Sequence, residues 1–308
     1  MRHHECDPPT SRSGPRRRPV FAAAALAGVC LTAAGCAGDG GPGPGAGPQS
    51  ATRPASPSAS APPGTPGTSA SPSAGSTSAR PLPEGPLAGR TVVIDPGHNP
   101  GNRDHTREIN SQVDIGTGRK ECDTTGTATD AGYAEARFTL DVSRRLRTLL
   151  EEQGAEVVLT QDGDRPWGPC VDERARIGNK EKADAVVSIH ADGSATGNRG
   201  FHVILPAAVN AGGADTSEIV VPSRELGVRI AGNFVRVTGS APSNYIGDST
   251  GLDTRDDLGG LNLSTVPKVF IECGNMRDPK DAALLTSAGW RQKAALGIAG
   301  GIGSYLKR

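Results

Sequence analysis

Three apolar segments of this 308-residue sequence each end in a side chain that can bind a metal ion or transfer a proton. These side chains are His98, His190 and Glu272, and a fourth such group, Glu135, stands where a helical pattern begins. Two imidazoles and one carboxylate suit a catalytic zinc ion with one position open to water, and a further carboxylate can act as general base. The residue types therefore predict metal-assisted hydrolysis.

Each of these side chains also has a structural interpretation. A histidine at a strand end can be a capped structural residue, and Glu135 can be a carboxylate that interacts with a helix dipole. Glu272 directly follows an apolar strand, where an unpaired carboxylate is costly and so usually has a partner or a chemical role. His105 and His202 are competing candidate ligands, but neither stands at the carboxyl end of an apolar strand.

The elements that must position these groups alternate along the chain as in a sheet with helices on its faces. Hydrophobic patterns predict five strands, over residues 91–94, 155–160, 185–189, 200–205 and 268–271. Helical patterns begin at Ala134 and end before Gly154, and others cover residues 171–182, 223–238, 279–285 and 289–306. Residues 99–130 are a long polar stretch with room for one small hairpin, and residues 240–265 are predicted to be a long loop. Ligands bind at the carboxyl edge of such sheets, where the four groups would meet.

Composition divides the chain into three parts. The 33 basic and 33 acidic residues balance, so nothing points to nucleic acid or another polyanion as partner. Residues 37–89 are almost entirely Gly, Pro, Ser, Ala and Thr, a composition that cannot bury enough apolar surface to fold and that predicts a flexible tether. Residues 90–308 have the length of one domain, and no long exposed apolar helix is evident, so we expect a monomer.

Residues 1–36 have the pattern of an export signal. Arg16–Arg18 precede an uncharged, alanine-rich run that is too short to be a comfortable membrane span. The run ends in small residues before Cys36, as in a bacterial lipoprotein signal in which that cysteine becomes the acylated N-terminus. The alternative is an ordinary secretory signal, and either one predicts an extracytoplasmic protein.

Export places the cysteines that follow the signal in an oxidising compartment, where disulfides form. Cys122 and Cys170 stand in polar, Gly- or Pro-rich loops and form the natural disulfide pair, whereas Cys273 lies on an apolar strand as a buried thiol. The alternative, a zinc ion bound by all three, has no CxxC spacing to support it.

The order of motifs resembles a known family. Four segments carry the resemblance: Val93–Gly101, Gly132–Glu135, Val187–Asp192 and Pro267–Met276. Together they resemble the zinc-dependent N-acetylmuramoyl-L-alanine amidases of the Amidase_3 type, above all the compact mycobacterial and actinobacterial members without a separate cell-wall-binding domain. The resemblance implies a single α/β domain, with a twisted, mainly parallel sheet of about six strands and helices on both faces. It also implies Zn²⁺ as cofactor, with His98, Glu135 and His190 as ligands and Glu272 as the catalytic carboxylate.

The implied substrate is peptidoglycan, cleaved at the amide between N-acetylmuramic acid and the L-alanine of the stem peptide. Candidate substrate-binding residues are Arg255, in the predicted loop 240–265, and Asn99, although that loop can equally be plain surface. A polar insertion over residues 104–129 resembles the disulfide-braced insertions of actinobacterial relatives, while Asn275–Asp278 departs from the commoner family sequence. Two alternatives remain: a zinc peptidase or deacetylase acting on the same polymer, and a catalytically silent peptidoglycan-binding lipoprotein or activator of another hydrolase.

Overall fold

In the computed structural model of the protein, residues 84–307 are described. The predicted signal peptide, Cys36 and residues 37–83 of the predicted tether lie outside this range. Within residues 84–307, no helix combines the length and the hydrophobicity that crossing a membrane requires.

The last residues of the predicted tether belong to the folded domain. Leu87 is only 1% exposed and packs in the main hydrophobic core, and its N–H donates to the carbonyl of Gln153 at 2.9 Å. A single leucine among Gly and Pro residues gives no periodicity, so composition alone assigned residues 84–89 to the tether. The folded region therefore begins before Arg90.

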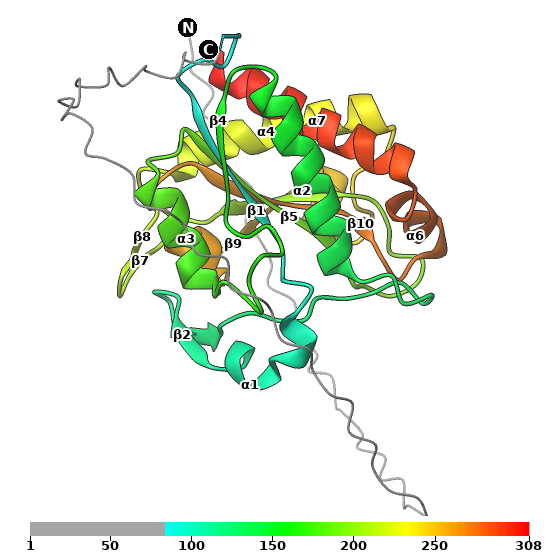
Figure 1. The fold of residues 1–308 in the computed structure, drawn as a ribbon, viewed down its shortest axis with the longest axis horizontal. Coiled ribbons are helices and arrows are strands. Elements are labelled where there is room, and N and C mark those ends of the chain that lie inside the picture. Colours follow the sequence, from blue (N-terminus) through cyan, green and yellow to red (C-terminus); the bar gives the residue numbers. More distant parts are fainter. Residues whose placement is uncertain (1–83, 308) are drawn as a thin grey trace, which may run out of the picture. The chain divides into compact units, whose positions relative to one another are not determined.

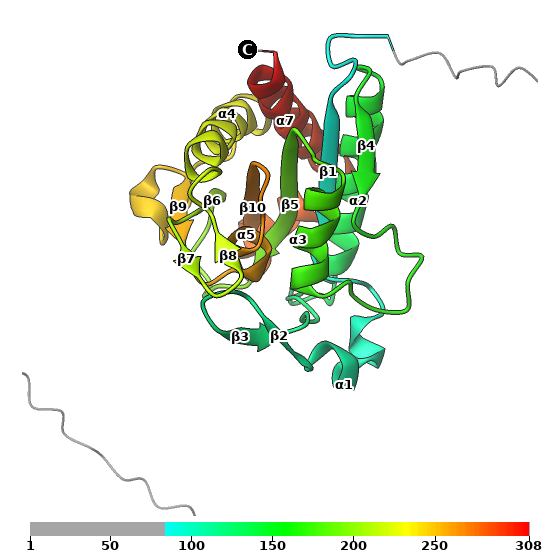
Figure 2. The ribbon, with the colours of Figure 1, turned by 90° about the vertical axis from the view of Figure 1, so that its left-hand side faces the viewer.

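Six strands form one sheet in the order β4-β1-β5-β10-β6-β9 (Figure 1 and Figure 2). Four of them are parallel neighbours: β4 (Glu156–Leu159), β1 (Thr91–Pro96), β5 (Ala185–Asp192) and β10 (Lys268–Asn275). Strand β6 (His202–Pro206) runs antiparallel to β10, and β9 (Leu252–Arg255) runs parallel to β6. This confirms the mainly parallel sheet of about six strands.

Helices cover both faces of the sheet, as Figure 2 shows. Three long helices lie on one face: α2 (Glu135–Glu151), α4 (Val220–Thr238) and α7 (Ala288–Leu306). The other face carries the shorter helices α3 (Val171–Lys180) and α5 (Gly259–Asn262). The main core lies under the long helices, and only a small cluster around Val93 and Val186 packs against α3.

Strand β9 corrects one expectation. Residues 240–265 were predicted to form a loop, but they contain the turn η2 (Gly247–Ser249), the strand β9 and the helix α5. The β9 sequence, Leu-Asp-Thr-Arg, has one apolar residue because the strand is at the sheet edge and none of its residues is fully buried. Such a strand leaves no hydrophobic pattern to detect.

Several shorter elements lie between the strands and helices in the sequence. The polar stretch after β1 contains η1 (Asn102–Asp104), α1 (Thr106–Ile109) and the hairpin of β2 (Gln112–Asp114) and β3 (Arg119–Glu121). A second small hairpin pairs β7 (Asn210–Ala211) with β8 (Ala214–Asp215). Helix α6 (Pro279–Leu285) begins at the N-cap Asp278, whose carboxylate accepts two backbone N–H groups.

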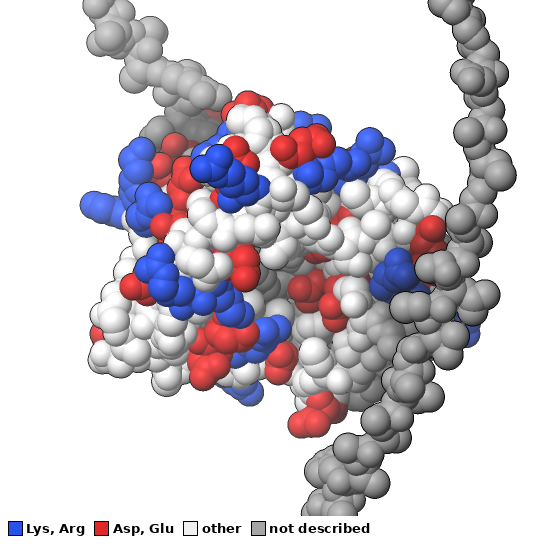
Figure 3. All heavy atoms as spheres, turned by 90° about the horizontal axis from the view of Figure 1, so that it is seen from below, with Lys and Arg blue, Asp and Glu red and all other residues white. Residues whose placement is uncertain are grey.

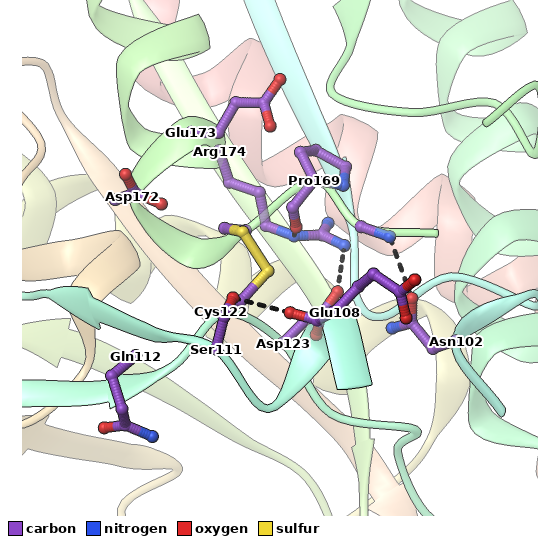
Figure 4. Close-up of a disulfide and its surroundings, with 12 residues drawn as sticks. Asn102, Glu108, Ser111, Gln112, Cys122, Asp123, Pro169, Asp172, Glu173 and Arg174 are labelled. Carbon is purple, nitrogen blue, oxygen red and sulfur yellow. Dashed lines mark hydrogen bonds and ion pairs between the residues drawn. A yellow bond between two sulfur atoms is a disulfide. The ribbon is translucent and has the colours of Figure 1, made fainter. Parts of the chain in front are cut away.

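A disulfide joins the polar stretch to α3. Cys122 and Cys170 are bonded, with a sequence separation of 48 residues (Figure 4). Cys273 is a buried free thiol. Beside the bond, the N–H of Val171 donates to the carbonyl of Cys122 at 2.7 Å. The bond therefore ties the hairpin region to the start of α3.

Removing this disulfide is expected to destabilise the domain. The double variant Cys122→Ser/Cys170→Ser should lose about 2–4 kcal/mol in the free energy of unfolding, because the unfolded chain is no longer cross-linked. Urea denaturation of the variant beside wild type measures the loss, and wild type with reduced cysteines should match the variant. Equal denaturation midpoints for oxidised wild type and the variant would contradict the expectation.

Candidate active site

His98, Glu135 and His190 meet at the carboxyl edge of the sheet. His98 follows the end of β1, Glu135 is the first residue of α2, and His190 lies near the end of β5. One donor atom from each residue can be chosen so that all three atoms lie within 4.8 Å of one another. Residues from three separate elements therefore form one group with the donor atoms of a metal site.

Both imidazoles face the same carboxylate. Nε2 of His98 lies 3.2 Å from Oε2 of Glu135, and Nδ1 of His190 lies 3.1 Å from Oε1. The carboxylate also accepts the N–H groups of Thr127 at 2.9 Å and Ala191 at 3.1 Å. These bonds fix the orientation of Glu135 between the two rings. Two ring nitrogens and a carboxylate oxygen, converging from separate elements, are a donor set that Zn²⁺ favours.

The charges of this group shift its pKa values. Burial alone would lower the pKa of His98, but the carboxylates of Glu135 and Asp123 raise it well above the ordinary value. Burial would raise the pKa of Glu135, yet the two histidines hold it well below the ordinary value. The carboxylates of Glu135 and Asp123 therefore favour the protonated form of His98.

Close packing explains one glycine beside the site. A Cβ atom at Gly97 would lie 2.4 Å from Cε1 of the His190 ring. Only glycine leaves room for that ring next to the turn that follows β1.

Glu272 stands next to this group on the neighbouring strand. In the register of the sheet, Glu272 pairs with His190 on β5 and with His202 on β6. Its Oε2 atom is buried and has no hydrogen-bond partner among residues 84–307. Burial raises the pKa of Glu272 well above its ordinary value, and the charges of Glu135 and Asp192 add to this shift. An unpartnered buried carboxylate oxygen is costly, which points to a chemical role.

The four residues share one cavity of about 490 Å³. Its wall also includes Asp192, Arg255 and Phe270, and the Phe270 ring stacks on His190 with centroids 5.2 Å apart. Figure 3 looks onto this side of the molecule, where acidic and basic side chains are interspersed.

The two candidate substrate-binding residues differ in their placement. Arg255 lines the cavity, and its guanidinium donates to both carboxylate oxygens of Asp257, at 2.7 and 2.8 Å. Lys120, on β3, donates to the same carboxylate at 2.8 Å. Asn99 is instead buried, and its amide donates to the carbonyl of Gly168 at 2.9 Å. The structure therefore gives Asn99 a role in holding a loop, and it does not line the cavity.

The competing histidines do not join the group of His98, Glu135 and His190. His105 lies beside Glu108, with Nδ1 and Oε2 3.8 Å apart. His202 is buried on β6, and its Nδ1 has no partner among the described residues. Its ring meets that of Tyr245 edge-on, and the Tyr245 hydroxyl donates to Asp192 at 2.6 Å. In the sheet, His202 pairs with Glu272 on the side opposite to His190, so Glu272 lies between it and the group of three residues.

A set of buried charges beneath the site was not recognised from the sequence. Asp95, Asp123, Arg174 and Lys268 are each at most 5% exposed. Arg174 donates to Asp95 at 2.8 Å and to Asp123 at 2.9 Å, and Lys268 donates to Asp95 at 3.1 Å. The available signals were an aspartate and a lysine within otherwise apolar strands. The sequence held no signal that Arg174 is buried, since its helix has the charged composition of a solvent-exposed helix.

The sequence matches the Amidase_3 family, described as N-acetylmuramoyl-L-alanine amidase, over residues 92–304. It is 41% identical over 225 residues to the N-acetylmuramoyl-L-alanine amidase Rv3717 of Mycobacterium tuberculosis, covering 71% of this chain and 88% of that protein. Identity to the N-acetylmuramoyl-L-alanine amidase AmiA of Escherichia coli is 27%, over 70% of this chain and 76% of that protein.

Solved structures agree with these matches. The amidase Ami1 of Mycobacterium smegmatis aligns with a TM-score of 0.65 and 41% identity, over 72% of this chain and 99% of that one. Ami1 of Mycobacterium abscessus, in its apo form, aligns with a TM-score of 0.65 and 43% identity, over 71% of this chain and all of that one. The fold, the matched residues and these identities together show that the chain belongs to the Amidase_3 family of N-acetylmuramoyl-L-alanine amidases.

Proposed function

We propose that this enzyme hydrolyses the amide between N-acetylmuramic acid and the L-alanine of the peptidoglycan stem peptide, with Zn²⁺ held by His98, Glu135 and His190. The observation that carries the proposal is the unpartnered Oε2 atom of Glu272, which shares a cavity with the His–Glu–His group. When bound, the zinc ion would polarise the scissile carbonyl and lower the pKa of a water molecule.

Glu272 is the proposed general base. Its Oε2 atom makes no hydrogen bond within residues 84–307, so it is free to accept a proton from the attacking water. Its raised pKa allows the carboxyl group to hold that proton and pass it to the departing amine of L-alanine. Glu135 is unsuited to this task, because its carboxylate oxygens already accept bonds from the rings and from two backbone N–H groups.

Arg255 is the proposed contact for the stem peptide. Stem peptides carry carboxylates, and a guanidinium attracts them in a cavity that otherwise contains Glu135, Glu272 and Asp192. The bidentate pair with Asp257 holds this cation in one position.

The proposed location is outside the cytoplasm. A signal over residues 1–36, acylation of Cys36 and a flexible tether over residues 37–83 would attach the domain to the membrane surface within reach of peptidoglycan. The disulfide Cys122–Cys170 supports an oxidising compartment. We infer a monomer for the domain.

Substituting the site residues should separate the general base from a ligand. Glu272→Gln should lower the rate of stem-peptide release from purified peptidoglycan by about 10²–10⁴-fold while the protein retains zinc, because only proton transfer is lost. His190→Ala should lose both zinc and activity. Release is measured by chromatography and zinc by elemental analysis.

Asp162→Asn is the control, since Asp162 pairs with Arg144 and Arg147 on the surface. If wild-type protein binds peptidoglycan but carries no zinc and releases no stem peptide, the protein is instead a catalytically silent peptidoglycan-binding protein. Release of a different product would point to a peptidase or deacetylase.

Zinc affinity should fall with decreasing pH. The metal binds neutral imidazoles, and the raised pKa of His98 means that protons compete at pH values above those at which an ordinary imidazole titrates. The dissociation constant of zinc, measured by chelator competition between about pH 8 and about pH 6, should therefore rise steadily. A constant value over this range would contradict ligation by these histidines.

Replacing Arg255 should weaken substrate binding more than turnover. Arg255→Gln is expected to raise KM for soluble muramyl peptides about tenfold, which corresponds to roughly 1.4 kcal/mol, with a smaller change in kcat. Arg229→Gln is the matched control, because Arg229 lies on α4 and pairs with Glu225 at the surface. Equal KM values for both variants would remove Arg255 from the proposed substrate contacts.

A further inference from the structure

Arg174 uses every hydrogen-bond donor of its guanidinium. A guanidinium has five N–H groups in a planar fork, and five acceptors surround this one. The acceptors are the carbonyls of Pro169 (2.9 Å), Pro96 (2.6 Å) and His98 (3.0 Å), and the carboxylates of Asp95 (2.8 Å) and Asp123 (2.9 Å). The side chain is 5% exposed. A lysine, with three donors on one nitrogen, cannot reproduce this arrangement.

One of these bonds holds the backbone of His98. The φ angle of His98 is +62°, in the left-handed region that residues with a side chain adopt at a cost. Its carbonyl accepts from Nη2 of Arg174 at 3.0 Å and from Nε2 of Gln161, also at 3.0 Å. Two donors on one carbonyl stabilise the unusual conformation, which turns the ring toward Glu135.

A second bond acts on the ring of His98 through Asp123. The Asp123 carboxylate binds Arg174 through Oδ2, and its Oδ1 lies 3.5 Å from Nδ1 of His98. That ring nitrogen also donates to the carbonyl of Thr124 at 3.1 Å. Nδ1 therefore lies near two acceptors, the Asp123 carboxylate and the Thr124 carbonyl, so with a metal ion bound at Nε2 the proton of the neutral ring would stay on Nδ1.

The parts that hold Arg174 are themselves anchored. Asp95 also accepts from Thr160 at 2.7 Å, Ser188 at 2.8 Å and Lys268 at 3.1 Å. The disulfide anchors the same two segments, since Cys122 directly precedes Asp123 and Cys170 is the N-cap of α3, the helix that carries Arg174. Figure 4 shows the Arg174 guanidinium beside the disulfide, directed at Asp123. These contacts therefore hold the Arg174 guanidinium in one position beside Asp123 and the backbone of His98.

We propose that Arg174 is a positioning residue for His98, fixing its backbone directly and its ring through Asp123. The inference rests on the zinc site of the proposed function. Arg174 is buried and lies far from His98 in the sequence, and it would hold one ring nitrogen of His98 toward the metal. Such partners behind a ligand typically change metal affinity about 10–100-fold when removed.

The test compares zinc binding in Asp123→Asn and Asp281→Asn. Asp281 is also a buried aspartate paired with an arginine, Arg199, but it contacts none of His98, Glu135, His190 or Glu272. We expect the zinc dissociation constant to rise about 10–100-fold in Asp123→Asn and to stay at the wild-type value in Asp281→Asn. The absorption spectrum of the cobalt(II)-substituted protein should change only in Asp123→Asn. Thermal unfolding of the metal-free proteins reports stability separately.

Arg174→Lys should show the same loss of affinity, and if it does not fold, Asp123→Asn still decides the question. Wild-type zinc affinity and an unchanged cobalt spectrum in Asp123→Asn, with only a lower unfolding temperature, would overturn the inference and leave Arg174 a structural role. Wild-type protein that binds no zinc would overturn the zinc site itself, and the inference with it.

Discussion

The burial of charge beneath the cavity is the constraint on which this architecture depends. Asp95, Asp123, Arg174 and Lys268 lie in the interior, and removing one partner from such a set typically costs about 3–5 kcal/mol. The ion pairs among these residues compensate the buried charges. They also join β1, β10, α3 and the polar stretch after β1. Elements that carry His98 and Glu272 are thereby linked through ion pairs, and their relative positions are set by the core beneath them.

Strand alternation assigns the two faces of the sheet to different tasks. In β5 and β10, Val187, Ile189, Val269 and Ile271 point to the face covered by the long helices and belong to the main core. The intervening Ser188, His190, Phe270 and Glu272 point to the other face, which short elements cover incompletely. One strand pair thus provides both the apolar surface that stabilises the fold and the side chains of the cavity. A shift of register by one residue would exchange the two sets.

The sequence predicted the parts of the site that stand at element ends. His98, His190 and Glu272 were recognised because each follows an apolar run, and Glu135 because it begins a strongly periodic helix. Motif order then identified the family. The edge strand β9 was missed because its residues are only partly buried, and the packing of Leu87 was missed because one residue has no period. The role of Arg174 was missed because it depends on backbone carbonyls that come together only in the folded structure, and no local sequence pattern predicts these contacts.

The entry of the chain into the domain has a consequence for how the enzyme faces its substrate. Leu87 packs beside Gln153 before β1 begins, whereas His98 follows the end of that strand. The six residues of β1 span about 20 Å at roughly 3.3 Å per residue, so the first packed residues and the cavity lie at opposite edges of the sheet. Residue 84, where the described part of the chain begins, therefore belongs to the edge of the sheet away from His98 and the cavity. The edge that holds the cavity is not the edge at which this part of the chain enters the domain.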